Sequence, residues 1–150
     1  MSRPITDPPK QIKANFSSGE YDIPGGLQGT SFAELEKDVR WVLLYLQDTD
    51  ARIIIHAHTD TVGTVAENDS LSQKRAASAA KYMTDSIIWT GIGETPKALA
   101  TDRVIAKGEG QKEAEDALKK KEPTNWKQLI GTKKAENLDF RRFDIEYEFG

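Results

Sequence analysis

Residues 52–76 read RIIIHAHTDTVGTVAENDSLSQKRA, and the centre of the fold can be predicted from this stretch. After Arg52 come three consecutive isoleucines, and a short run that is apolar on both faces predicts a strand over 52–58 in the middle of a sheet. Residues 59–69 are polar and contain one glycine, which is typical of a loop. From about residue 70 to residue 85, small and apolar residues recur at helical spacing. The stretch therefore predicts a buried strand, a polar loop and a helix packed on the sheet.

The flanking sequence extends this alternation of strands and helices in both directions. Side-chain patterns predict strands over 11–16, 103–106 and 142–149, a helix over 31–47, and helical or partly ordered segments over 112–121 and 126–130. In the last strand, we expect the side chains at alternate positions to face the core: Phe143, Ile145, Tyr147 and Phe149. The order β-α-β-α-β-β, with an insertion before the last strand, indicates an α/β (α+β) two-layer sandwich with a mixed four-stranded sheet.

The composition fits one folded domain and excludes several classes of function. The chain has 150 residues, and we expect one domain over 11–150, after a flexible leader or linker end over 1–10 and with an insertion at about 111–138. No cysteine is present, which excludes disulfides, thiolate metal sites and a cysteine nucleophile. A net charge of −3 gives no reason to expect binding to nucleic acid, and no apolar run is long enough to insert into a membrane.

A spaced motif runs from the end of the predicted central strand into the following helix. It comprises His58-Thr59-Asp60, Gly63, Asn68, Leu71-Ser72 and Arg75-Ala76. Shorter matches flank it at Asn15-Phe16, Tyr21-Asp22-Ile23, Gly91-Ile92, Gly108-Glu109-Gly110 and Arg141-Arg142. Together these residues span about 11–149, and they resemble the C-terminal domains of the OmpA/MotB/Pal family. The fold implied by the resemblance agrees with the one predicted from the pattern of strands and helices.

The resemblance implies non-covalent binding of peptidoglycan, which would anchor an envelope protein or complex to the cell wall. The ligand would be the diaminopimelate of the stem peptide, with its ammonium on Asp60 and a carboxylate on Arg75; Phe16 belongs to the same implied site. The positions of the two charged residues support this division independently. An aspartate that follows a central strand lies where α/β sheets bind ligands, and an arginine early in the next helix lies near N–H groups that attract anions.

The other motif residues have supporting roles in the implied site. Asn68 would orient the loop or touch the ligand, Leu71 would pack beneath it, and Thr59 would offer its backbone N–H. Arg142, or its neighbour Arg141, would contact a second carboxylate. The resemblance implies a binding module with no catalytic residue, no cofactor and no metal ion. It also implies a bacterial protein of the periplasm or cell envelope, associated with the outer membrane.

The first residues lack the apolar segment of a signal peptide. We therefore expect either a cytoplasmic protein or, following the resemblance, an envelope protein whose targeting segment lies outside this chain.

The sequence departs from the family pattern at three positions. Ala57 replaces a glycine, Ser17 stands where many members have an acidic residue, and Phe140 replaces an asparagine before the two arginines. The changes at Ser17 and Phe140 remove groups that would support the ligand. They leave a second function open, in which the domain assembles a motor, secretion or injection machine and contacts other envelope proteins through the 111–138 insertion.

Three further interpretations concern individual residues. Asp60 and Arg75 could form a structural ion pair with each other. A metal-dependent hydrolase could use His56, His58 and Asp60, because two histidines at alternate positions of a strand share one face. The lysine-rich stretch over 112–134 could be a solvated face or a contact surface for a partner or for glycan-strand acids. Trp89 and Trp126 lie near the insertions, and either could be an exposed aromatic at a partner surface.

Overall fold

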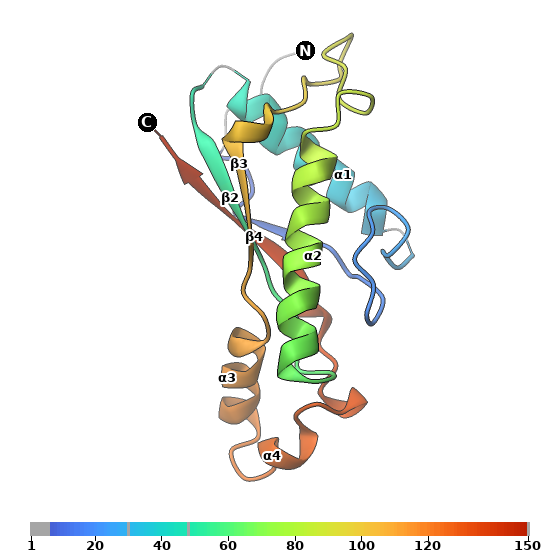
Figure 1. Ribbon diagram of the computed structural model, residues 1–150, viewed down its shortest axis with the longest axis vertical. Coiled ribbons are helices and arrows are strands. Elements are labelled where there is room, and N and C mark those ends of the chain that lie inside the picture. The colour runs from blue at the N-terminus through green and yellow to red at the C-terminus, as the bar shows by residue number, and fades with distance from the viewer. Residues whose placement is uncertain (1–6, 30, 48, 150) are drawn as a thin grey trace.

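The computed structural model describes residues 7–29, 31–47 and 49–149, which form a four-stranded sheet covered by helices (Figure 1). The strands are β1 (Gln11–Lys13), β2 (Arg52–Ala57), β3 (Val104–Gly108) and β4 (Arg142–Glu148), in the spatial order β1-β4-β2-β3. β2 is parallel to β3, whereas β4 is antiparallel to both of its neighbours. The predicted α/β sandwich with a mixed sheet is confirmed, and most of the predicted leader lies outside the described residues.

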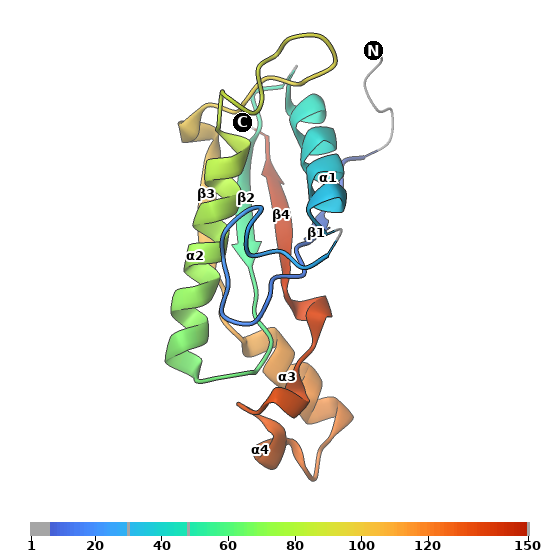
Figure 2. The same cartoon turned by 90° about the vertical axis from the view of Figure 1, so that its right-hand side faces the viewer.

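Two long helices, α1 (Ser31–Leu46) and α2 (Val65–Met83), cover the same face of the sheet (Figure 2). Between them and the sheet lies a core to which α1 contributes Leu35, Val39, Val42, Leu43 and Leu46, and the strands contribute Ile12, Ile53, Ile55, Phe143 and Ile145. α2 lies close against β3 at Gly108, where a Cβ atom would overlap the backbone nitrogen of Gln73. Glycine at this position therefore sets how near the helix lies to the strand.

Helix α2 begins five residues before the predicted start because a capping box precedes its apolar stripe. The hydroxyl of Thr64 accepts a hydrogen bond from the backbone N–H of Glu67 (3.1 Å), and the Glu67 carboxylate accepts one from the N–H of Thr64 (3.1 Å). These bonds satisfy helix-terminal groups that have no partner within the helix. The early start places Asn68 in the first turn of α2 and Leu71 in the second, but it leaves Arg75 in the third turn. Arg75 therefore does not lie beside the free N–H groups at the helix start, contrary to the expectation.

The insertion before β4 lies at the end of the molecule where β2 ends (Figure 1). It contains α3 (Lys112–Lys121), α4 (Trp126–Leu129) and the short 3-10 helices η2 (Lys133–Ala135) and η3 (Leu138–Phe140); another, η1 (Thr101–Arg103), precedes β3. Gly131 joins the insertion to the β2–α2 loop: its N–H donates to the carbonyl of Thr61 (2.6 Å), and its carbonyl accepts from Gly63 (3.0 Å). The insertion is therefore packed against the loop that carries the motif.

Several local predictions differ from the structure. β1 ends at Lys13, and Phe16 instead forms an isolated bridge with Leu27. The inward-facing pattern of β4 holds for Phe143, Ile145 and the partly buried Tyr147. It fails for Phe149, which follows the end of the strand and is 63% exposed. Trp89 is buried, so its expected exposure is wrong. Its indole N–H donates a hydrogen bond to the carbonyl of Tyr82 (2.8 Å), which satisfies the polar group of this side chain inside the core. In the part of the chain that the structure describes, no helix combines the length and apolar character needed to cross a membrane.

Candidate functional site

A small pocket of about 130 Å³ lies where the β2–α2 loop, the first turns of α2, the 17–29 loop and the residue before β4 meet. Its lining contains most of the motif together with residues distant in sequence: Ser18, Gly19, Thr59, Asp60, Val62, Gly63, Glu67, Asn68, Leu71, Arg75 and Arg141. Asp60 and Arg75 therefore line one pocket, as the resemblance implies. Arg141 completes it from the other end of the chain.

Asp60 forms a buried ion pair with Arg141. Its Oδ2 atom accepts hydrogen bonds from Arg141 Nε (3.0 Å) and from the backbone N–H of Asn137 (3.0 Å), and Arg141 Nη2 lies 2.9 Å away. The other oxygen, Oδ1, accepts a single bond from the N–H of Val62 (3.2 Å). The side chains of Asp60 and Arg141 are only 5% and 2% exposed, so each charge depends on the other. The interpretation in which Asp60 pairs with Arg75 is wrong, because Arg141 occupies that position.

Arg75 is a buried cation whose hydrogen-bond partners are backbone carbonyls. Nε donates to the carbonyl of Glu20 (2.9 Å), Nη2 donates to that of Ser17 (3.4 Å), and the guanidinium lies 4.6 Å from the centre of the Phe16 ring. Among the residues that the structure describes, no carboxylate forms an ion pair with it. Burial and the nearby charge of Arg141 lower the pKa of Arg75 to about 10, against the opposing effect of Asp60. Arg75 is thus still charged at neutral pH, and within the described ranges its direct contacts are carbonyl groups and an aromatic ring, with no carboxylate among them.

The remaining motif residues mainly shape the loop. Asn68 is buried, and its side-chain amide donates to the carbonyls of Asp60 (3.3 Å) and Val62 (2.9 Å) and to the side chain of Gln111 (2.7 Å). Asn68 therefore orients the loop, and these contacts already occupy the N–H groups of its side-chain amide. The expected role of the Thr59 N–H is wrong, because that group donates to the carbonyl of Gly110 (3.0 Å). The hydroxyl of Thr59, in contrast, is buried and has no partner among the described residues.

Arg142 points away from the pocket, which corrects its expected contact with a second carboxylate. Its guanidinium binds Asp144 (Nε to Oδ1, 3.0 Å) and Glu113 (Nη2 to Oε2, 2.7 Å). Arg141 caps the end of the short helix η3 and Arg142 begins β4, and the two side chains have different partners, so only one of the neighbouring arginines reaches the pocket. That residue is Arg141, which the sequence offered only as the alternative. Its Nη1 also donates to the carbonyl of Phe16 (2.8 Å), so Phe16 contributes a backbone acceptor and a ring beneath Arg75.

The histidines and Asp60 do not form a common metal centre. His56 contacts Glu109 (Nδ1 to Oε1, 2.6 Å) and Glu146 (Nε2 to Oε1, 3.0 Å), whereas Asp60 binds Arg141. Within the described ranges, the grouping of possible metal ligands is a different one and contains His58, Glu113 and Asp144. The hydrolase interpretation on His56, His58 and Asp60 is therefore wrong in its geometry.

The family model described as the OmpA family matches residues 28–125, which is more than half of the chain. The chain belongs to the OmpA family. No curated protein matches it. Among solved structures, it is similar to the OmpA-like domain of FopA1 from Francisella tularensis subsp. tularensis SCHU S4, with 16% identity and a TM-score of 0.54 over 91% of this chain and 71% of that one. It is also similar to the peptidoglycan-associated lipoprotein from Burkholderia pseudomallei, with 20% identity and a TM-score of 0.53 over 93% and 91% of the two chains.

The residues matched by the OmpA family model do not include the whole pocket. Residues 28–125 contain Asp60, Asn68 and Arg75 but neither Phe16 nor Arg141. The likeness to the two solved structures extends over more than nine-tenths of the chain. The ion pair between Asp60 and Arg141 is therefore a feature of the tertiary structure, and it links the matched centre of the domain to the segment before β4.

Proposed function

We propose that this OmpA-family domain binds peptidoglycan non-covalently through the diaminopimelate of the stem peptide and anchors an envelope protein or complex to the cell wall. Asp60 binds the ligand's ammonium and Arg75 its carboxylate. Family membership and the likeness to a peptidoglycan-associated lipoprotein support the general function. The proposed ligand rests on the chemistry of the pocket. The function is binding alone, in the periplasm or elsewhere in the cell envelope, and assigns no catalytic step.

The uncompensated charge of Arg75 is the observation that carries the proposal. A buried guanidinium that meets only carbonyl oxygens has lost its hydration without gaining a counter-ion, which lowers its pKa. A ligand carboxylate in the pocket supplies that counter-ion. Each charge-assisted hydrogen bond of this kind contributes about 1.5–3 kcal/mol. Arg75 therefore favours an anionic group in the pocket more than any neighbouring side chain does.

The two oxygens of Asp60 differ in how much room they leave for a ligand. Oδ2 already accepts bonds from Arg141 and from the N–H of Asn137, whereas Oδ1 accepts one bond, from Val62 at 3.2 Å. A ligand ammonium is therefore expected on Oδ1. Arg141 holds the carboxylate in place, and the hydroxyl of Thr59 offers a further polar partner on the pocket wall.

The size of the pocket limits what enters it. Its volume of about 130 Å³ is below the ~300–1,000 Å³ typical of sites that enclose a whole small molecule. It fits the zwitterionic end of one amino acid, with the rest of the peptide and the glycan outside. Two or three charge-assisted bonds correspond to affinities of about millimolar to micromolar for one stem. Many copies on a polymeric wall would raise the overall affinity.

Sedimentation with isolated cell walls tests this proposal. The domain is expected to sediment with walls that contain diaminopimelate and to remain in solution with walls that carry lysine at the same position. Lysine has the ammonium for Asp60 but lacks the second carboxylate for Arg75. This comparison uses unaltered protein, so a folding defect cannot produce the result. Equal sedimentation with both walls would contradict the assigned ligand.

Two variants test the residues within the same assay. Arg75→Gln and Asp60→Asn are expected to abolish sedimentation, whereas Lys81→Gln and Asp102→Asn change the net charge equally at exposed positions and should leave it unchanged. Circular dichroism identifies any variant that has lost its fold. If folded Arg75→Gln protein sediments like the original, Arg75 is not the carboxylate-binding residue.

The insertion supports a second role, as a contact surface for other envelope proteins. Trp126 lies between two lysines, with Lys119 Nζ 4.5 Å and Lys127 Nζ 5.8 Å from its ring centre. Such an aromatic and basic surface suits an acidic partner. Replacing Lys119 and Lys127 with glutamate is expected to prevent assembly without reducing wall binding. Loss of wall binding in the same variant would instead assign the insertion to the peptidoglycan site.

A further inference from the structure

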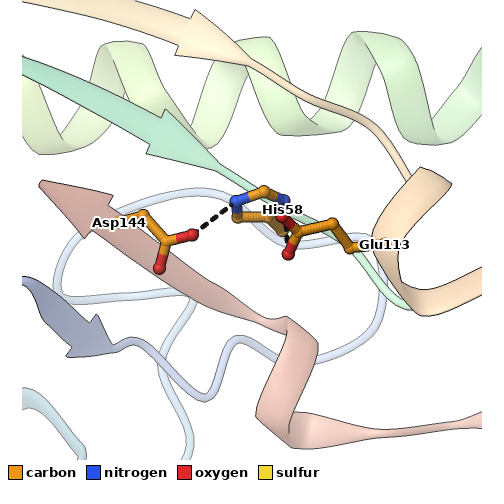
Figure 3. Close-up of side chains that lie close together, drawn as sticks. All are labelled: His58, Glu113 and Asp144. Carbon is orange, nitrogen blue, oxygen red and sulfur yellow. Dashed lines mark hydrogen bonds and ion pairs between the residues drawn. The ribbon is translucent and has the colours of Figure 1, made fainter. Parts of the chain in front are cut away.

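A second cluster of charged side chains lies on the other side of the β2 end from the pocket, and the proposed function does not use it. His58 follows β2, Asp144 lies in β4, and Glu113 lies in the first turn of α3, so three separate elements meet there (Figure 3). The His58 side chain is 5% exposed, whereas Glu113 reaches the cluster from the surface and is 51% exposed.

The contact with Asp144 defines which nitrogen of His58 carries the proton. Nε2 lies 2.9 Å from Asp144 Oδ2, and a carboxylate accepts hydrogen bonds, so Nε2 is the protonated nitrogen. In the neutral ring this leaves a lone pair on Nδ1. That atom is buried and has no hydrogen-bond partner among the described residues. A buried polar atom without a partner destabilises the fold unless something binds it.

The group that faces Nδ1 is the carboxylate of Glu113. Its Oε2 lies 3.7 Å from Nδ1, which is too long for a hydrogen bond. Two ligand atoms that each lie about 2.0–2.1 Å from one tetrahedral zinc ion are about 3.4 Å apart, so a separation of this size suits a bridging ion. A carboxylate that accepts from the second ring nitrogen of a metal-bound histidine, as Asp144 does from Nε2, is a common support of such sites.

We propose that His58 Nδ1 and Glu113 bind a divalent transition-metal ion of the zinc class, with Asp144 positioning the imidazole. Water or an external ligand completes the coordination. Neutral imidazole and carboxylate are both suitable ligands for such ions. The ion would tie the first turn of α3 to the end of β2. No sequence pattern indicated this grouping, because its three residues come from distant parts of the chain.

Arg142 is the competing cation in this cluster. Its Nη2 lies 2.7 Å from Glu113 Oε2, and its Nε lies 3.0 Å from Asp144 Oδ1. A metal ion must displace the contact with Glu113 or share that carboxylate, while Arg142 keeps its bond to Asp144. Removing the guanidinium is therefore expected to tighten metal binding, an effect that ions held by unrelated surface carboxylates would not show.

Zinc titration of chelator-stripped protein, by competition with a chromogenic chelator, tests the proposal. One equivalent is expected to bind, Glu113→Gln is expected to weaken the affinity by about tenfold or more, and Arg142→Gln is expected to strengthen it. His56→Gln and Glu115→Gln are the matched controls and should leave the affinity unchanged. Glu113 and Glu115 lie on the same helix and each pairs with one cation, Arg142 and Lys119 respectively, so Glu115→Gln controls for the loss of a paired carboxylate.

Nitrogen NMR of the histidine rings provides a readout that does not depend on any substitution. Zinc is expected to shift the Nδ1 resonance of His58 and to leave Nε2 protonated. The proposal is overturned if no zinc binds at concentrations up to about 1 mM. It is also overturned if zinc binds equally well to the protein and to Glu113→Gln.

Discussion

Arg141 lies against Asp60, with Nη2 2.9 Å from Oδ2, and both side chains are almost completely buried. The two residues are 81 positions apart in sequence, so this pair joins the loop after β2 to the segment before β4. Because Arg141 pairs with Asp60, the guanidinium of Arg75 has no carboxylate partner among the described residues.

Removing Arg141 is expected to destabilise the fold strongly. Arg141→Met leaves the Asp60 carboxylate buried without its partner, and breaking a buried pair in this way costs about 3–5 kcal/mol. Urea denaturation measures the free energy of unfolding. The double variant Asp60→Asn, Arg141→Met should be more stable than the single one, because the uncompensated charge is gone. A loss below about 1 kcal/mol in the single variant would be typical of an exposed pair and would contradict the buried one.

Because α2 lies so close to β3 at Gly108, we expect any side chain at this position to destabilise the fold. Gly108→Ala places a Cβ against the backbone of Gln73, and the helix must move. We expect a loss of about 1–3 kcal/mol, the usual cost of overpacking, measured by the same denaturation. Gly25→Ala is the control, because its nearest new neighbour, Asp22 Cβ, would lie at an ordinary contact distance of 3.9 Å. Equal stability of the two variants would show that α2 is not held this closely.

Because α2 starts at Val65, we expect the side chain of Thr64 to contribute to the stability of the fold and that of Ser70 not to contribute. Thr64→Ala removes the capping hydroxyl and is expected to cost about 0.5–2 kcal/mol. Ser70→Ala, at an exposed position inside the helix, should be neutral or slightly stabilising. The opposite order of the two effects would move the helix start to the later position.

The same cap makes the stability of the first turn of α2 depend on pH. Hydrogen bonds from Thr64 hold the pKa of Glu67 below its usual range. The contribution of the cap is therefore present above the pKa of an unfolded glutamate and is lost as the pH falls through the lower, folded value.

His56 predicts a pH dependence of opposite sign. Burial alone lowers the pKa of His56, but hydrogen bonds and charge from Glu109 and Glu146 outweigh this effect and raise it. A raised pKa contributes stability that is complete below the unfolded value and is lost as the pH rises through the folded one. The free energy of unfolding should therefore decrease between about pH 6 and pH 8, around the ordinary histidine pKa. His56→Gln should reduce this slope, and an unchanged slope would contradict the assignment.

The sequence was most informative where strand, loop and helix follow one another directly. Asp60 and Arg75 could be placed at one site because one short loop separates the central strand from the helix that carries Arg75. The choice between Arg141 and Arg142 could not be made in this way. Neighbouring residues of an extended chain point to opposite sides, and one residue of shift in register exchanges them.

The later parts of the fold depend on contacts that no local pattern contains. The capping box at Thr64 and Glu67 lies in sequence that is too polar to extend the apolar stripe of α2, so the helix was predicted to begin too late. Glu113 meets His58 and Asp144 only after the insertion has folded against the sheet. The exposure of Phe149 has a similar cause, since alternation continues in the sequence after the strand has left the core.

Titration of the labelled domain with a soluble stem peptide tests directly whether Arg75 binds the second carboxylate of diaminopimelate. The Nε–H resonance of Arg75 is followed by NMR while a peptide with diaminopimelate, or its lysine counterpart, is added. We predict a saturable shift with the diaminopimelate peptide at about millimolar to micromolar affinity, and none with the lysine peptide. A resonance that does not move with the diaminopimelate peptide, or that moves equally with both, would contradict the account.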